Sequence, residues 1–148
     1  MESKLISIQE ANRMLPLLRS IVKSIMDTWE VLITSRVELE TLEKAQVKAE
    51  VIKSKKEELN VTIDRINNYI REVEELGCFV QEFKRGIVSF PSLFHGRKVF
   101  LCWIPDDQTV THWHELDEMF ANRQAIRGPY FLEAPVPKDT KGAYDCKC

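Results

Sequence analysis

The sequence predicts an α+β fold: a long antiparallel α-helical hairpin packed with a small antiparallel β-sheet and a short C-terminal helix. The chain has 148 residues, the size of one ordinary domain. Residues 1–76 contain one proline and no glycine, whereas residues 77–148 contain all five glycines and the other five prolines. The first half has apolar residues at helical spacing, and the second half has short apolar runs between turn residues. The predicted units are one domain over 1–126, comprising a hairpin over 7–76 and a β-meander with a short helix over 77–126, and a C-terminal tail over 127–148.

The first helix is expected to begin at a capping box. In Ser7-Ile8-Gln9-Glu10, the serine side chain can accept from the backbone N–H of Glu10, whose carboxylate can reach back to Ser7. Steps of three and four residues then separate Ile8, Ala11, Leu15, Leu18, Val22, Ile25, Trp29, Leu32 and Leu39. A period of about 3.5 residues is typical of a long helix that packs along another helix. Pro16 predicts a kink, and we interpret Asn12 as a cap for it.

A change of register predicts a turn after the first helix. Past residue 42, the first seam would fall on Glu43, Gln46, Glu50 and Lys53, which are all polar. A second seam, in a different register, appears at Ile52, Leu59, Ile63, Ile66, Ile70 and Val73. An unbroken helix does not absorb such a shift smoothly, so we place a turn within 43–50. No Gly or Pro marks that turn, and one helix of about 100 Å stays the alternative. Gly77 stands where a glycine would end the second helix.

The second half predicts an antiparallel meander. The expected strands are Cys78–Phe83, Ile87–Phe90, Lys98–Ile104 and Thr109–His114. Pro91 is expected to end the second strand, and His95-Gly96 to form a tight turn in which His95 takes the role of Asn or Asp. The spacing of Leu116, Met119, Phe120 and Arg123 predicts the short helix. Within the tail, the run Tyr130-Phe131-Leu132 is expected to dock on a hydrophobic face.

Charge and composition restrict the partners. The chain has 21 basic and 23 acidic residues, a formal net charge of −2, whereas nucleic-acid-binding proteins usually carry a basic surplus. No apolar run approaches the ~18 residues that span a membrane. The N-terminus has no apolar core of a signal peptide, so the four cysteines are expected to be reduced. We therefore expect a cytoplasmic protein with no nucleic-acid partner and no membrane partner.

A set of short motifs within residues 5–126 carries a family resemblance. The motifs are Glu10-Ala11-Asn12, Leu15-Pro16, Leu76-Gly77-Cys78, Gly86-Ile87-Val88, Phe90-Pro91, Leu101-Cys102-Trp103, Trp113-His114-Glu115 and Phe120 with Arg123-Gln124. Together with a charged hairpin, they resemble an uncharacterised prokaryotic family known as domain of unknown function 2203. The resemblance implies no activity. At Met119, Asn122 and Ala125 the chain departs from the family's small or turn residues.

The segment His112-Trp113-His114-Glu115 is the candidate site. On a strand, residues i and i+2 share a face, so His112 and His114 would point the same way. Two imidazoles with the Glu115 carboxylate suit iron, zinc or copper, and a histidine on an apolar wall can also be an axial haem ligand. The structural alternative is a half-exposed histidine pair that bonds a neighbouring glutamate or carbonyl oxygen.

The expected strand register decides whether a cysteine joins this site. If Ile104 pairs with Thr109, then Leu101 faces His112 and Val99 faces His114. Cys102 would then lie on the opposite face of the sheet, and a slip of one residue would reverse this. We therefore expect that Cys102 is not a ligand.

Weaker candidates lie elsewhere in the second half. Arg97 and Arg123, with Arg127 and the N-terminus of the short helix, could hold an anion, or could form surface salt bridges. The role of Cys146-Lys147-Cys148, which could bind a soft metal or oxidise, stays open. The sequence has no phosphate loop, nucleophile elbow or metal helix of the H-E-x-x-H type.

Two functions follow from these patterns. The first is an interaction or oligomerisation module that self-associates, most simply as a C2 dimer, or binds a protein partner through its hairpin. It accounts for the seams, which cover more of the chain than any site. The second is a small protein that binds a transition metal (Fe, Zn or Cu) or haem through His112, His114 and Glu115. Whether the protein is an enzyme is left open by its residues.

Overall fold

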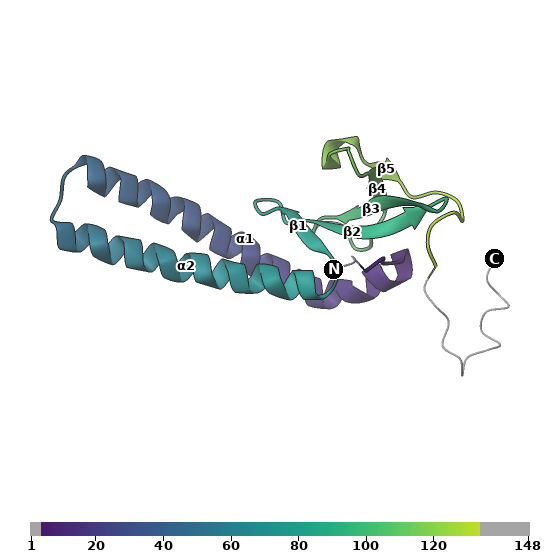
Figure 1. The fold of residues 1–148 in the computed structure, drawn as a ribbon, viewed down its shortest axis with the longest axis horizontal. Coiled ribbons are helices and arrows are strands. Elements are labelled where there is room, and N and C mark those ends of the chain that lie inside the picture. The colour runs from purple at the N-terminus through teal and green to yellow at the C-terminus, as the bar shows by residue number, and fades with distance from the viewer. Residues whose placement is uncertain (1–3, 134–148) are drawn as a thin grey trace.

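The computed structural model describes residues 4–133, which form a helical hairpin with a sheet on one side of it (Figure 1). The hairpin consists of α1 (Ile8–Lys44) and α2 (Ala49–Glu75). The strands are β1 (Phe79–Glu82), β2 (Ile87–Phe94), β3 (Arg97–Trp103), β4 (His112–Glu115) and β5 (Gln124–Ala125), with a 3-10 turn, η1 (Phe120–Asn122), before β5. All neighbouring strands are antiparallel, in the order β1-β2-β3-β4-β5. The predicted α+β fold is confirmed.

The capping box starts α1 as expected. The Ser7 Oγ accepts from the Glu10 N–H at 3.0 Å, and the Glu10 carboxylate accepts from the Ser7 N–H at 3.0 Å. The helix continues through Pro16 for 37 residues in all. The turn between the helices falls at residues 45–48, inside the predicted range, and Gln46 takes a left-handed conformation with φ of 52°. The chain is therefore a hairpin and not one continuous helix.

β2 runs past Pro91, so the prediction that Pro91 ends this strand is wrong. All of β3 pairs with β2, and the paired residues of β2 run from Val88 to Phe94. β1 pairs with β2 only as far as Ser89, so a strand neighbour is absent on that side at Pro91 and the missing N–H costs no ladder bond. The Pro91 carbonyl oxygen instead accepts from the Ile6 N–H at 2.7 Å.

The predicted short helix is only the single turn η1, and β5 after it was not predicted. The Glu118 N–H donates to the Glu115 carbonyl oxygen and forms a tight turn directly after β4. Leu116 and Met119, which suggested a helix, are exposed.

The core lies between the hairpin and one face of the sheet. It contains α1 residues such as Leu18, Val22 and Ile25, together with the sheet residues Phe90 and Leu101, all fully buried. A second, smaller cluster lies on the opposite face of the sheet and contains Ile87, Cys102 and Phe120. The sheet is therefore covered broadly on the hairpin side and locally on the other side.

The segment after β5 returns to the sheet. Phe131 pairs with Phe94 in an isolated bridge and is buried in the main core. The Leu132 N–H donates to the Leu93 carbonyl oxygen at 3.0 Å. The expected docking on a hydrophobic face is confirmed for Phe131. Tyr130 is exposed and stacks on His95 at 4.2 Å between ring centroids. Residues 134–148, with Cys146-Lys147-Cys148, lie outside the described residues.

Candidate functional site

The register between β3 and β4 differs by one residue from the prediction. Cys102 lies opposite His112 and Phe100 opposite His114, so Leu101 and Val99 do not face the histidines. The expected four-residue turn was too short, because β3 ends at Trp103 and β4 begins only at His112. Cys102 therefore shares a sheet face with both histidines, and the prediction that it lies on the opposite face is wrong.

The His114 ring is fully buried, and within residues 4–133 only one of its two nitrogens has a hydrogen-bond partner. Its Nδ1 lies 2.8 Å from the Glu115 carbonyl oxygen. A carbonyl oxygen only accepts, so Nδ1 carries the proton and Nε2 holds a lone pair when the ring is neutral. Nε2 has no hydrogen-bond partner among the described residues. The ring packs against Phe100, with 5.7 Å between centroids.

The other predicted ligands are engaged separately. The His112 Nδ1 lies 2.9 Å from the Thr111 Oγ1. The Glu115 carboxylate accepts two hydrogen bonds from the Arg97 guanidinium, at 3.1 and 2.5 Å. Within residues 4–133, no three His, Cys, Asp or Glu side chains gather as they would around a metal ion. The described residues thus offer one free nitrogen at His114 rather than a preformed set of ligands.

The predicted anion site is divided between two places. Arg97 binds Glu115, and its guanidinium lies over the Phe94 ring at 5.1 Å. Arg123 lies over the Phe120 ring at 4.0 Å and donates to the Phe120 carbonyl oxygen. The two guanidinium groups have different partners, so the structure does not bring them together around one anion.

The two described cysteines belong to the two hydrophobic core clusters. Both are buried, and within residues 4–133 neither forms a disulfide. Burial raises the pKa of the Cys78 thiol to about 12 and that of the Cys102 thiol to about 12. A thiol with such a pKa holds almost no nucleophilic thiolate near neutral pH.

Two residues of α1 organise the loop between β3 and β4, and sequence reasoning missed both roles. The Arg19 guanidinium donates to the carbonyl oxygens of Pro105, Asp107 and Gln108 and lies over the Trp103 ring at 5.2 Å. The Asn12 Oδ1 accepts from the Val110 N–H, so Asn12 does not serve the predicted kink cap. These contacts join positions nearly a hundred residues apart, which no local pattern reveals.

A groove of about 640 Å³ lies beside the sheet face that carries Phe100. Its apolar lining includes Leu5, Phe79, Pro91, Phe100 and Leu116, and its charged lining comprises Lys4, Glu74, Glu75 and Lys98. Phe79 and Phe100 meet edge to face, with 5.3 Å between centroids. Neither His112 nor His114 is among the lining residues.

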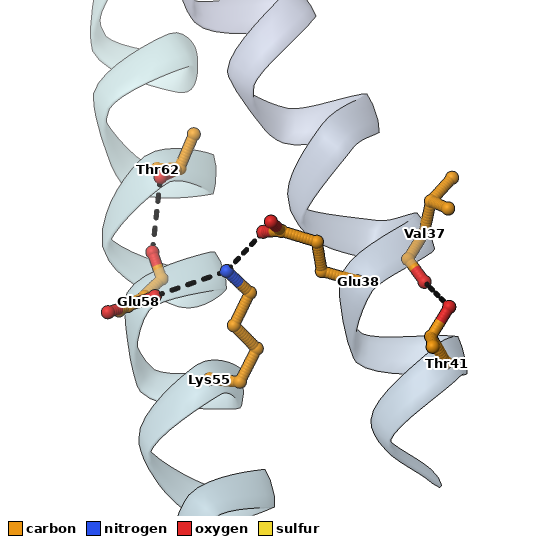
Figure 2. A network of polar contacts seen from close by, with 6 residues as sticks. All are labelled: Val37, Glu38, Thr41, Lys55, Glu58 and Thr62. Carbon is orange, nitrogen blue, oxygen red and sulfur yellow. Dashed lines mark hydrogen bonds and ion pairs between the residues drawn. The ribbon is translucent and has the colours of Figure 1, made fainter. Parts of the chain in front are cut away.

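Residues 30–63, here called the arm, extend past the sheet (Figure 1). Its helices are joined by Lys55, whose ammonium lies 2.5 Å from Glu38 and 3.4 Å from Glu58 (Figure 2). The Glu38 carboxylate raises the pKa of Lys55 above its ordinary value. Six of the ten exposed large hydrophobic side chains of residues 4–133 belong to the arm: Val31, Ile33, Val37, Val51, Val61 and Ile63.

No helix in residues 4–133 has an apolar stretch long enough to cross a membrane. The family model for an uncharacterised conserved protein (DUF2203) matches residues 4–126. No significant match to this chain is found among curated proteins or among solved structures. The match therefore covers both the hairpin and the sheet, and it brings no assigned activity.

Proposed function

Because the chain belongs to the DUF2203 family of uncharacterised conserved proteins, we propose its function from geometry: it is a protein-interaction module whose arm makes the contact. The concentration of exposed apolar side chains on the arm carries this proposal. Large exposed apolar surfaces on soluble proteins usually mark interaction sites. The sheet packs against the part of the hairpin outside the arm and so holds the helices from which the arm extends.

The interior of the arm supports the same interpretation. Buried positions in and beside it include the polar residues Thr28, Ser35 and Thr62, and Lys55 bridges the helices beyond them. These residues contribute less hydrophobic stabilisation than a leucine seam would. The two helices of the arm share a small apolar interface and carry exposed valine side chains. A partner that covers these side chains would stabilise the arm, because it buries the remaining apolar surface.

Site-specific photo-crosslinking in living cells tests the proposal. A benzophenone amino acid replaces Val31 or Val51 on the arm, and a matched variant carries it at the exposed Gln124 of β5. We expect covalent adducts of defined mass from the arm positions and none from Gln124. Adducts from Gln124 alone, or from no position, would contradict the proposal.

The alternative function, binding of a transition metal or haem, is supported by one observation, the free and buried Nε2 of His114. A metal-bound histidine typically donates its other ring N–H to a carbonyl or carboxylate, as the His114 Nδ1 does. A catalytic or structural site needs further ligands, and Glu115 is held by Arg97. Elemental analysis and an ultraviolet–visible spectrum of protein purified without a metal-affinity tag decide between the two functions.

We propose a cytoplasmic location together with the interaction function, and the lack of a disulfide between the two described cysteines supports it. Cys78 and Cys102 are free thiols in separate parts of the core. Oxidising compartments favour disulfides, whereas the cytoplasm keeps thiols reduced. Fractionation of cells that produce the full chain tests this location.

A further inference from the structure

The groove beside Phe100 has an apolar floor on the sheet face that points away from the hairpin. Phe100 lies opposite Pro91 in the pairing of β2 with β3, so the two residues share a face. The next residue of β3, Leu101, belongs to the main core on the hairpin side, and successive strand residues point to opposite faces. The Phe79 ring meets the Phe100 ring on this outer face and also lines the groove. The hairpin therefore leaves this aromatic floor uncovered.

Charged side chains stand at the rim of this groove. Glu74 and Glu75 lie at the C-terminal end of α2, where the helix dipole adds partial negative charge. Lys4 lies beside Gly77 at the same end, and Lys98 lies on β3 across the floor. Within residues 4–133, none of these four charged side chains forms an ion pair. The end of the groove at α2 therefore presents two carboxylates and one ammonium group to a ligand.

The described part of the chain ends close to this groove. Phe131 pairs antiparallel with Phe94, so the chain runs back along the edge of β2 towards Pro91, about 10 Å away at 3.3 Å per residue. The place beside Pro91 is taken by Ile6, whose N–H donates to the Pro91 carbonyl oxygen at 2.7 Å. The chain that follows Glu133 cannot pair with β2 there. It therefore leaves the edge beside Pro91, which lines the groove.

We infer that the groove binds residues 134–139 of the same chain, whose sequence is Ala-Pro-Val-Pro-Lys-Asp. This contact is separate from the arm and goes beyond the proposed function. At 3.1 Å per residue, six extended residues span about 19 Å. Neighbouring strands lie about 4.8 Å apart, so a segment of this length reaches across several strands of the sheet.

The apolar part of this segment fits the floor of the groove. The rings of Pro135 and Pro137 fix φ near −65°, and a residue that precedes a proline, such as Val136, favours an extended backbone. A segment that is extended before it binds loses little conformational entropy when it docks. Extended proline-containing segments characteristically bind grooves that aromatic side chains line, as Phe79 and Phe100 do here.

The charged part of the segment complements the rim. Lys138 directly follows the apolar residues and can pair with Glu74 or Glu75, while Asp139 can pair with Lys4. Exposed ion pairs contribute little energy each, so these pairs chiefly fix how far the segment advances along the groove. A tether to the same chain gives the segment a high effective concentration at the groove, which favours it over a separate partner of similar chemistry.

Paramagnetic relaxation in the full chain tests the inference. A nitroxide is attached to Val136→Cys in a chain that also carries Cys146→Ser and Cys148→Ser. Cys78 and Cys102 are buried and should not react. We expect the nitroxide to broaden the amide NMR signals of the residues that line the groove and to leave those at the tip of the arm sharp. The same sample with the nitroxide reduced is the reference.

Matched variants separate docking from chance proximity. Leu116 and Met119 are 51% and 68% exposed after β4, and of the two only Leu116 lines the groove. In the labelled chain, Leu116→Lys should reduce the broadening at the groove, because it places a charge against the apolar segment, and Met119→Lys should leave it unchanged. Lys138→Glu should lower the ratio of docked to undocked chain by about fivefold, because it replaces an attraction to Glu74 and Glu75 with a repulsion.

Two outcomes would overturn the inference. Sharp signals from the groove residues in the labelled chain would show that residues 134–139 bind elsewhere or not at all. Broadening that responds equally to Leu116→Lys and Met119→Lys, or to neither, would show that the contact does not depend on the groove. Circular dichroism checks the fold of each variant, and Lys138→Glu keeps the test decisive if Leu116→Lys does not fold.

Discussion

The Asn12 side chain holds the backbone of Val110: its Oδ1 accepts from the Val110 N–H at 2.7 Å, across 98 residues of sequence. Val110 is buried, so this N–H cannot turn to solvent instead. Arg19 binds the same loop just before Val110, where its guanidinium donates to three backbone carbonyl oxygens. Together these two residues of α1 set where β4 begins, and with it the position of His112 and His114.

Asn12→Ala should destabilise the protein by about 1–3 kcal/mol, because it leaves a buried N–H without an acceptor. Denaturant unfolding followed by circular dichroism measures this change. Asn60→Ala is the matched control, since Asn60 is exposed on α2. A difference of less than a few tenths of a kcal/mol between the two variants would show that the hydrogen bond is unimportant.

Gly86→Ala should be more damaging than Gly96→Ala. Both glycines have positive φ, at 70° and 79°, so each alanine carries a similar backbone cost. A Cβ on Gly86 would lie 2.7 Å from both the Met26 Sδ and the Val22 Cγ1, whereas no atom of residues 4–133 lies within 4 Å of one on Gly96. The clash should add about 1–3 kcal/mol of destabilisation for Gly86→Ala in urea unfolding. Equal losses for the two variants would mean that α1 moves away without cost.

Gln46→Gly should stabilise the hairpin by up to about 1 kcal/mol. Gln46 has φ of 52°, a left-handed conformation that costs a side-chain-bearing residue about 1–2 kcal/mol and costs glycine much less. Ala45→Gly is the control, because Ala45 has helical dihedral angles and glycine there should destabilise. Thermal unfolding of both variants compares the two signs, and a loss of stability in Gln46→Gly would contradict the argument.

His114→Phe should change stability by less than about 1 kcal/mol, whereas His114→Ala should lose about 2–4 kcal/mol. Phenylalanine fills the same space and removes an unpaired buried nitrogen, while alanine leaves a cavity. The Glu115 carbonyl oxygen keeps the Glu118 N–H as a donor in both variants. Wild-type protein that contains stoichiometric metal, lost in His114→Phe, would instead establish the metal-binding alternative.

The Arg97 guanidinium holds the pKa of Glu115 below its ordinary value of 4.5, chiefly through hydrogen bonds to the carboxylate. A lowered folded-state pKa means that this carboxylate stabilises the fold above its unfolded-state pKa. That contribution is lost as the pH falls through the folded-state value. In a carbon-13 NMR titration, Arg97→Gln should return the pKa of Glu115 towards 4.5 and leave Glu82, which Arg85 holds low, unchanged. An unmoved Glu115 would show that the ion pair does not persist in solution.

The helices and their cap were predictable because their signals are local. Ser7 with Glu10 is a four-residue pattern, and the two seams differ in register on either side of the turn. His95, with φ of 52°, also takes the left-handed turn position that its neighbour Gly96 suggested. Gln46 shows the limit of such reasoning, since a left-handed residue that is not glycine leaves no compositional mark.

The candidate site was less predictable because its register depends on distant contacts. The loop before β4 is held by Asn12, Arg19 and the Trp103 Nε1, which donates to the Asp107 carbonyl oxygen at 2.9 Å. Because this loop is longer than the predicted turn, Cys102 lies on the same sheet face as the histidines. The prediction that Pro91 ends its strand failed for a similar reason. A proline fits within β2 only because β1 stops pairing with β2 before Pro91.

The Pro91 carbonyl oxygen and the residues beyond it have a consequence for association between molecules. Ile6, from the start of the chain, and Tyr130–Leu132, from beyond the sheet, take up hydrogen-bonding groups of β2 at Pro91, Leu93 and His95. An open strand edge is a template on which other chains can add and aggregate. Both ends of the described chain therefore protect this strand edge from pairing with other molecules. Truncation of either end would expose hydrogen-bonding groups of β2.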